Sequence, residues 1–215
     1  MIIFDKRLII IIIIIMVTTH SSIENNIKRY KRGEVIMPSD FRGKGTQDAI
    51  KKTLSRLSTK GTIKRLGHGL YVLPKIDPLF GMILPSTEEV AIALAKKEKV
   101  KIKPAGIFAL HKLGLTLQVP TKLVYLTDGN SRVITVGKNI IRFKSTTPKK
   151  MAIKGELSGL IILALEELGI DQIDELTKIK LRNLLEKENP MYLKQDLKLA
   201  SVAVHDFLLK LILKK

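Results

Sequence analysis

The stretch that decides the fold is "TQDAIKKTLSRLSTKGTIKRLGHGLYVLPK", from Thr46 to Lys75. Its first half predicts an amphipathic helix, with Thr46 as N-cap and Gly61 closing the C-terminus. The predicted buried stripe consists of Ile50, Leu54 and Leu57. Two glycines around His68 then predict a tight turn between two strands, because glycine adopts positive φ without steric cost.

The opposite side of the predicted helix is polar and basic. Such a face fits the major groove of DNA, where Gln, Lys and Arg meet base edges and phosphates. The hairpin tip would reach the neighbouring backbone. The residues predicted to contact DNA are Thr46, Gln47, Lys51, Lys52, Ser55 and Arg56 of the helix, and Lys64, Arg65 and His68 of the hairpin.

The residues before this stretch complete a pattern. "SSIENNIKRYKRG" predicts a helix with the Ser21-x-x-Glu24 spacing of a capping box, ending at Gly33. "EVIMP" predicts a short extended piece, and "SDFRGKG" a turn of helix or a loop. The order is helix, strand, short helix, basic helix and hairpin. It predicts a winged helix-turn-helix DNA-binding domain over residues 21–75.

Charge supports a polyanionic partner. The chain of 215 residues has a net charge of +18. Residues 21–75 hold 13 Lys/Arg against 4 Asp/Glu, residues 76–154 hold 14 against 5, and residues 155–215 hold 9 against 10. The basic excess therefore belongs to the first two-thirds of the chain, where it favours nucleic acid or an anionic membrane face.

Catalytic and metal-binding patterns are absent from the sequence. There is no cysteine, and the four histidines lack metal-ligand spacing. No phosphate-binding loop or nucleophile elbow occurs, and Asp128 has no second carboxylate two residues on. We therefore expect a binding protein rather than an enzyme, with no catalytic residues, metal or cofactor.

The first 20 residues are treated apart as an apolar extension. Ile9 to Ile15 are consecutive isoleucines, and the apolar run Leu8–Val17 is about half of the roughly 20 residues needed to cross a bilayer. Three interpretations are open: translation from Met16 with non-native residues before it, a signal or anchor segment, and a buried strand. The first is preferred, so we expect no membrane attachment.

Three quoted stretches resemble a known family. "IKRYKRGEVIMPSDF", "AIKKTLSRLSTKGTIKRLGHGLYVLPK" and "PAGIFALHKLGLTLQVPTKLVYLTDG" are similar to AbiEi-type antitoxins of type IV toxin–antitoxin systems. The resemblance runs from about Ser21 to Gly169. It implies a winged helix that represses the protein's own operon. It also implies a downstream domain that opposes a nucleotidyltransferase-like toxin, usually without a stable complex.

The rest of the chain predicts two further parts. Residues 76–170 predict an α+β antitoxin-like domain, including a helix from Pro104 that buries Ile107 and Leu110, and a second hairpin through Gly137. Residues 171–215 predict a helical extension that caps this domain. The cations expected to oppose the toxin are Lys122, Arg132, Arg142 and Lys144.

Taken together, the sequence predicts an α+β protein: a cytoplasmic antitoxin and autorepressor whose partners are double-stranded operator DNA and a toxin. Two alternatives stay open. One is a winged-helix regulator with a ligand-sensing second domain and no toxin partner. The other is a basic protein attached to a membrane through the isoleucine run.

Overall fold

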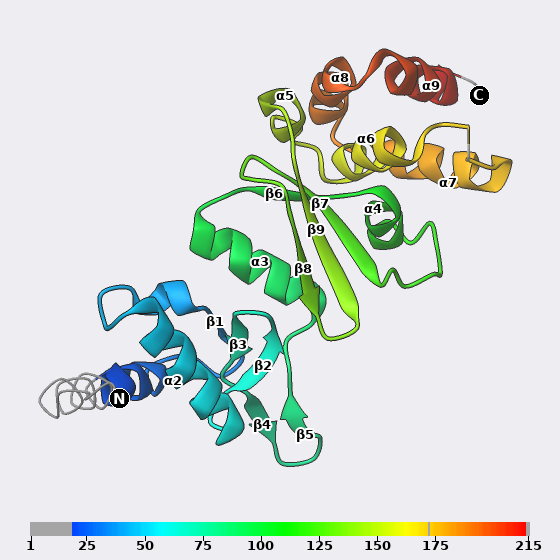
Figure 1. Ribbon diagram of the computed structural model, residues 1–215. Helices are drawn as coiled ribbons and strands as arrows, with labels where there is room; N and C mark the ends of the chain where they lie inside the picture. Colours follow the sequence, from blue (N-terminus) through cyan, green and yellow to red (C-terminus); the bar gives the residue numbers. More distant parts are fainter. Residues whose placement is uncertain (1–18, 172, 214–215) are drawn as a thin grey trace, which may run out of the picture. The chain divides into compact units, whose positions relative to one another are not determined.

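The computed structural model describes residues 19–171 and 173–213 (Figure 1). The fold is mixed α+β, and the chain divides into two compact units between Leu94 and Ala95. This boundary falls inside helix α3 (Thr87–Glu98), further along the chain than the expected boundary between residues 75 and 76. The isoleucine run and its three interpretations lie outside the described residues.

The first unit begins with a helix that includes residues 19–27. Thr19 and His20, which we assigned to the extension, lie in this helix, and Thr19 is buried. Ser21 is therefore an interior helical residue, and the expected capping box does not start the helix. The helix ends at Ile27, before the expected Gly33. Turns occupy most of residues 28–34.

Short elements follow this helix in the expected order. They are β1 (Val35–Ile36), the 3-10 helix η1 (Pro38–Phe41), α2 (Gln47–Thr59), β2 (Lys64–Gly67) and β3 (Leu70–Val72). The three strands form an antiparallel sheet in the order β1-β3-β2. A separate hairpin, β4 (Lys75–Asp77) and β5 (Gly81–Ile83), comes before α3.

The core of the first unit joins its helices to its sheet. The predicted stripe of α2 is confirmed, because Ile50, Leu54 and Leu57 are all at most 2% exposed. Each such side chain contributes roughly 1.5–3 kcal/mol when it is fully buried. The other members of the cluster are Ile23, Ile27, Ile36, Phe41, Ile63, Tyr71 and Leu73. The stripe therefore fixes which face of α2 meets solvent.

The second unit holds a four-stranded mixed sheet. Its strands are β6 (Ile102–Ala105), β7 (Lys122–Thr127), β8 (Arg132–Val136) and β9 (Asn139–Ser145), in the order β6-β7-β9-β8. Strands β7 and β9 are parallel, and the hairpin β8–β9 turns at Gly137 as predicted. The ring of Tyr125 is buried between the rings of Phe108 and Phe143, with centroids 5.3 and 6.0 Å away.

One helix of this unit differs from the prediction. Pro104 and Ala105 belong to β6, and helix α4 (Gly106–Lys112) starts only at Gly106, whose φ of +61° separates strand from helix. The buried face shifts accordingly, to Phe108 and Ala109, and Ile107 is 45% exposed. The expected burial of Ile107 was therefore wrong.

The remaining helices share a single core. They are α5 (Pro148–Met151), α6 (Glu156–Leu168), α7 (Glu175–Leu185), α8 (Pro190–Leu199) and α9 (Val202–Leu213). Leucines of α7, α8 and α9 pack in the same cluster as the isoleucines of α6. The C-terminal helices thus form the core of the second unit together with α6. None of the helices in the described part of the chain is long and apolar enough to cross a membrane.

Two carboxylates accept hydrogen bonds from backbone N–H groups at the N-terminus of α6. Asp196 is fully buried and accepts hydrogen bonds from the backbone N–H of Lys154 and Gly155, at 2.9 and 2.7 Å, and from the hydroxyl of Ser158 at 2.7 Å. Glu188 accepts from the N–H of Leu157 and Ser158, at 2.8 and 2.9 Å. Negative charge is favourable at a helix N-terminus, where N–H groups lack intrahelical partners. We call Ser158, Glu188 and Asp196 the carboxylate clamp.

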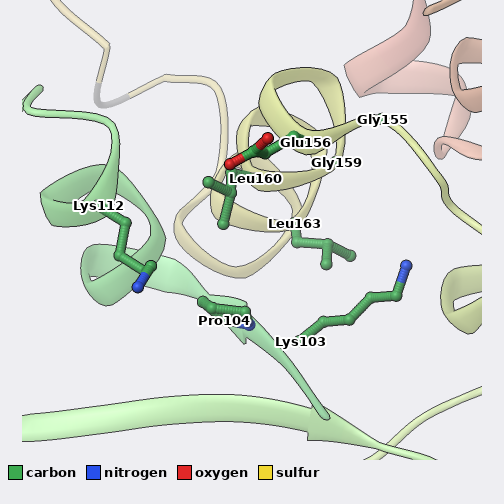
Figure 2. A pocket seen from close by; sticks show the side chains of 8 residues that line it. All are labelled: Lys103, Pro104, Lys112, Gly155, Glu156, Gly159, Leu160 and Leu163. Carbon is green, nitrogen blue, oxygen red and sulfur yellow. The ribbon is translucent and has the colours of Figure 1, made fainter. Parts of the chain in front are cut away.

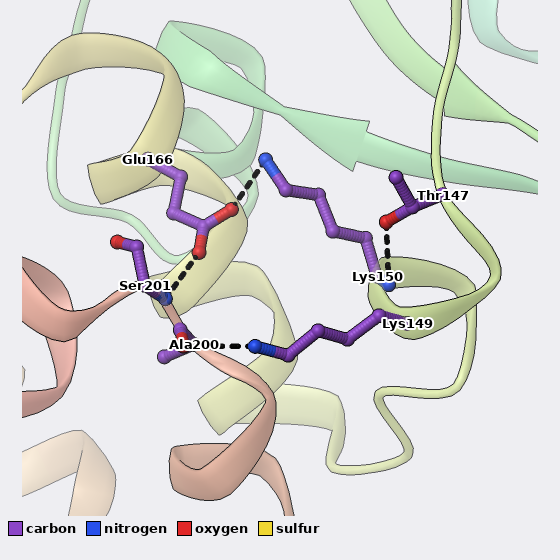
Figure 3. Close-up of polar contacts among 6 residues, drawn as sticks. All are labelled: Thr147, Lys149, Lys150, Glu166, Ala200 and Ser201. Atoms are coloured by element: carbon purple, nitrogen blue, oxygen red, sulfur yellow. Dashed lines mark hydrogen bonds and ion pairs between the residues drawn. The ribbon is translucent and has the colours of Figure 1, made fainter.

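A second polar contact holds α5 against the C-terminal helices (Figure 3). The Lys150 ammonium lies 2.5 Å from a carboxylate oxygen of Glu166, and the other oxygen accepts from the N–H of Ser201 at 2.8 Å. Ser201, which donates this N–H group, immediately precedes α9. Glu166 therefore links three segments of the second unit, and this arrangement is structural.

Candidate nucleic-acid interface

Helix α2 has well-formed ends. Thr46 is the N-cap, and its hydroxyl oxygen accepts a hydrogen bond from the N–H of Ala49 at 3.2 Å, as predicted. Asp48 lies in the first turn and Arg56 in the last, which is the order that suits the helix dipole. Gly61 follows the helix with φ +77°, a value that glycine tolerates best.

The solvent face of α2 contains every helix residue predicted to meet DNA. Thr46, Gln47, Lys51, Lys52, Ser55 and Arg56 are all exposed. Lys51, Lys52, Ser55 and Arg56 lie at i+4, i+5, i+8 and i+9 from Gln47, so they share one side of the helix with it, and Thr46 is the N-cap. Lys51, Lys52 and Arg56 form no ion pair among the residues that the structure describes. We call these three residues the α2 cations.

The positive charges on this face of α2 lower the stability of the protein when no partner is bound. Lys52 and Arg56 are neighbours at i, i+4, and like charges at that spacing destabilise a helix by roughly 0.2–0.5 kcal/mol. Asp48, four residues before Lys52, offsets part of this repulsion. A polyanion lying along the helix would remove the rest. Electrostatics therefore favour an anionic partner on this face.

The hairpin β2–β3 presents the other predicted residues. Lys64 and Arg65 are exposed on β2, opposite the buried Val72 and Tyr71 of β3. The guanidinium of Arg65 donates through Nε to the carbonyl of Gly67 at 3.2 Å, so this side chain lies along its own strand toward the tip.

The tip itself has the predicted form. His68 is exposed at the turn. Gly69 follows with φ +62°, in the left-handed region that favours glycine. Lys64, Arg65 and His68 thus lie within one exposed hairpin, and its short turn depends on Gly69.

In the second unit, three of the four predicted cations come together. Arg132, Arg142 and Lys144 line an open pocket of about 370 Å³ together with Ser131, Val133 and Phe143. Lys122 is exposed at the first residue of β7 and does not line it.

Two of these cations are engaged within the unit. Arg132 pairs with Glu98, and its guanidinium lies 4.7 Å from the centre of the Phe143 ring. Lys144 pairs with Glu167 of α6. Such pairing reduces the charge that the pocket offers to a partner, in contrast to the α2 cations.

A second hollow in this unit was not predicted. It has a volume of about 250 Å³, and Figure 2 shows that α6 forms one wall while β6 and α4 supply Lys103 and Lys112 opposite it. Burial lowers the pKa of Lys103, although Asp196 acts in the other direction, and its ammonium donates to the carbonyl of Ile153. Apolar Pro104, Leu160 and Leu163 complete the lining.

Sequence reasoning also missed the carboxylate clamp and the hairpin β4–β5. The clamp joins Ser158 to residues about 30 and 38 positions later, and no local pattern predicts such pairing. In the described residues no three His, Asp or Glu side chains gather in a group that could hold a metal ion.

Comparison with known proteins gives a family but no activity. No curated protein matches the chain. The sequence profile of a family of unknown function, DUF6088, matches residues 22–193. The match includes α2, both hairpins that follow it and the sheet of the second unit, and it ends within α8. Because it covers most of the chain, the protein belongs to the DUF6088 family.

Proposed function

We propose that this protein is a DNA-binding antitoxin and transcriptional autorepressor of a type IV toxin–antitoxin operon, acting in the cytoplasm. The first unit would bind operator DNA as a winged helix-turn-helix, with α2 in the major groove and β2–β3 as the wing. The second unit would oppose a nucleotidyltransferase-like toxin.

The observation that carries the DNA-binding part is the solvent face of α2. It combines three cations without ion-pair partners in the described structure with Gln47 and Ser55, whose side chains are of types that can hydrogen-bond to bases or phosphates. The element order, and the sheet order β1-β3-β2 that follows from the pairing of the three strands, support the proposal of a winged helix.

The test measures binding to duplex DNA from upstream of the gene by fluorescence anisotropy across a salt series. Replacing Lys51, Lys52 and Arg56 together with Ala should abolish specific binding. It should also reduce the dependence of log K on log salt by up to about 2.7, at about 0.9 for each lost phosphate contact. Thermal unfolding should change little, because the three side chains are exposed.

A matched control removes the same charge elsewhere. Lys194, Lys198 and Lys210 are exposed on α8 and α9, and their replacement with Ala lowers the net charge equally. This variant should keep nearly all operator affinity. Equal losses in the two triple variants would mean that α2 acts only through overall charge, and the proposed recognition helix would be wrong.

The antitoxin part is supported by the resemblance to AbiEi-type antitoxins together with the basic pocket of the second unit. A cation-lined hollow can oppose chemistry on a polyanionic substrate by competing for it. The test is a growth assay in cells that express the toxin encoded beside this gene, with and without the full chain at matched abundance. Growth arrest that the chain does not relieve would contradict this part alone.

A second candidate function rests on the hollow in Figure 2, where Lys103 and Lys112 flank apolar side chains. That lining suits a small acid with an apolar tail, as a ligand-sensing regulator without a toxin partner would need. A ligand of this class should raise the melting temperature of the chain and change its operator affinity. The Lys112→Ala variant, at an exposed residue of the same lining, should weaken both effects.

A further inference from the structure

The hairpin β4–β5 exposes an unusual amount of apolar surface. Leu79 and Phe80 at its tip are 88% and 81% exposed. Ile76 and Met82 lie directly opposite one another on its strands, and both are about half exposed or more. Ile83 and Leu84 are also exposed. Contiguous apolar surface of this kind marks an interaction site on a soluble protein.

The backbone of the hairpin is open as well. Among the residues that the structure describes, β4 and β5 pair only with each other, so the outer edge of each strand has no strand partner there for its N–H and C=O groups. An isolated two-stranded hairpin is marginally stable, and edge strands are usually protected by charges. Strand β5, with sequence Gly-Met-Ile, carries none. Its edge is therefore free to accept another strand.

Charge decides which partner fits. No Lys or Arg occurs from Ile76 to Ala95, although the chain has 38 such residues and a net charge of +18. The same segment contains the carboxylates Asp77, Glu88 and Glu89. The hairpin itself has a single cation, the exposed Lys75 at the start of β4, so it offers a nucleic acid very little positive charge. A second copy of this basic chain would avoid most of its like-charge repulsion at this surface, because the segment from Ile76 to Ala95 has no Lys or Arg.

We propose that the hairpin is a self-association surface, on which β5 pairs antiparallel with β5 of a second copy. The two-fold axis would pass close to Met82, the middle residue of the strand, and a four-stranded sheet would result. A two-fold interface brings the same residues together from both copies, and the uncharged strand β5 can pair with itself in this way without a complementary partner. The proposal does not depend on DNA binding or on a toxin.

The geometry gives a direct test because the chain has no cysteine. Residues opposite one another in an antiparallel pair have Cα atoms about 4.5–5.5 Å apart. A disulfide needs a separation of about 4.4–6.8 Å. A single Met82→Cys substitution in the full chain should therefore form a disulfide-linked dimer under mild oxidation. A matched control is Leu117→Cys, at a residue that is 98% exposed outside the hairpin, and it should stay largely unlinked.

Light scattering after size-exclusion chromatography gives the second readout. The unmodified chain should approach twice the 24.1 kDa mass of one copy as its concentration rises. Met82→Glu should keep the circular dichroism spectrum and remain a single copy at the same concentrations, whereas Leu117→Glu should still associate. An unmodified chain that stays a single copy throughout, or equal cross-linking of the two cysteine variants, would overturn the proposal.

Discussion

Replacing Gly155 with Ala should lower the free energy of unfolding of the second unit much more than replacing an exposed residue nearby. Gly155 precedes α6 as its N-cap and is buried. A methyl group there would lie 2.0 Å from the Ser158 hydroxyl, 2.6 Å from a Glu188 oxygen and 2.7 Å from an Asp196 oxygen. All three distances are shorter than real contacts of a β-carbon, so the carboxylate clamp would have to open.

The cost has two contributions. Forcing an extra carbon into a packed site costs about 1–3 kcal/mol. Displacing a carboxylate also breaks at least one charge-assisted hydrogen bond, which is worth about 1.5–3 kcal/mol. We therefore expect Gly155→Ala to lower the free energy of unfolding by about 2.5–6 kcal/mol. That is a large fraction of the roughly 5–15 kcal/mol that stabilises a typical domain.

The assay is urea denaturation of the full chain, followed by circular dichroism because tryptophan is absent. The control is Glu156→Ala, one residue away and exposed, which removes only a favourable charge near the helix N-terminus. It should cost about 0.3–1 kcal/mol. The reasoning would be refuted by a Gly155→Ala chain as stable as the Glu156→Ala chain.

Three further predictions concern the wing, pH and the basic pocket. Gly69→Val should disorder the tip of β2–β3 and weaken operator binding, because valine does not tolerate φ +62°; an unchanged amide spectrum at the tip by NMR would contradict this. Burial raises the pKa of Glu188, but the N–H groups of Ser158, Asn189 and Leu157 outweigh it, so the pKa lies below its ordinary 4.5. Stability from this carboxylate is therefore present above that value and lost as pH falls through the lowered pKa, and Glu188→Gln should flatten the acid limb of unfolding free energy against pH. Arg142→Ala should reduce protection from the toxin at unchanged melting temperature, whereas Arg132→Ala should lower the melting temperature, because it breaks the contacts with Glu98 and Phe143.

Local patterns were sufficient for the first unit. The cap at Thr46, the stripe of α2 and the glycine turn at the tip of β2–β3 depend on residues at most a few positions apart, and all three were predicted. The first helix was located correctly, but its start was not. Its residues continue upstream to at least Thr19, and a capping-box spacing also occurs by chance inside helices.

Long-range contacts explain what sequence reasoning could not supply. The start of α4 moved to Gly106 because Pro104 and Ala105 pair with Tyr125 and Val124 of β7, and neither partner is close in sequence. The same holds for the carboxylate clamp. In both cases the structure depends on contacts between residues that are distant in sequence. Propensity and periodicity describe only local sequence and do not contain these contacts.

The candidate site follows a corresponding division. The exposure of the α2 cations could be deduced from the apolar stripe on the opposite side, because α2 buries a single face. The ion pairs of Arg132 and Lys144 could not be deduced from the sequence, because their partners Glu98 and Glu167 are distant from them along the chain. Residues 21–75 and 76–154 have the same net charge, 13 Lys/Arg against 4 Asp/Glu and 14 against 5, but their cations are paired to different extents. In the first unit the three α2 cations have no ion-pair partner among the described residues, whereas the second unit neutralises much of its pocket internally. That difference favours α2 over the basic pocket as the place where the proposed polyanionic partner would bind.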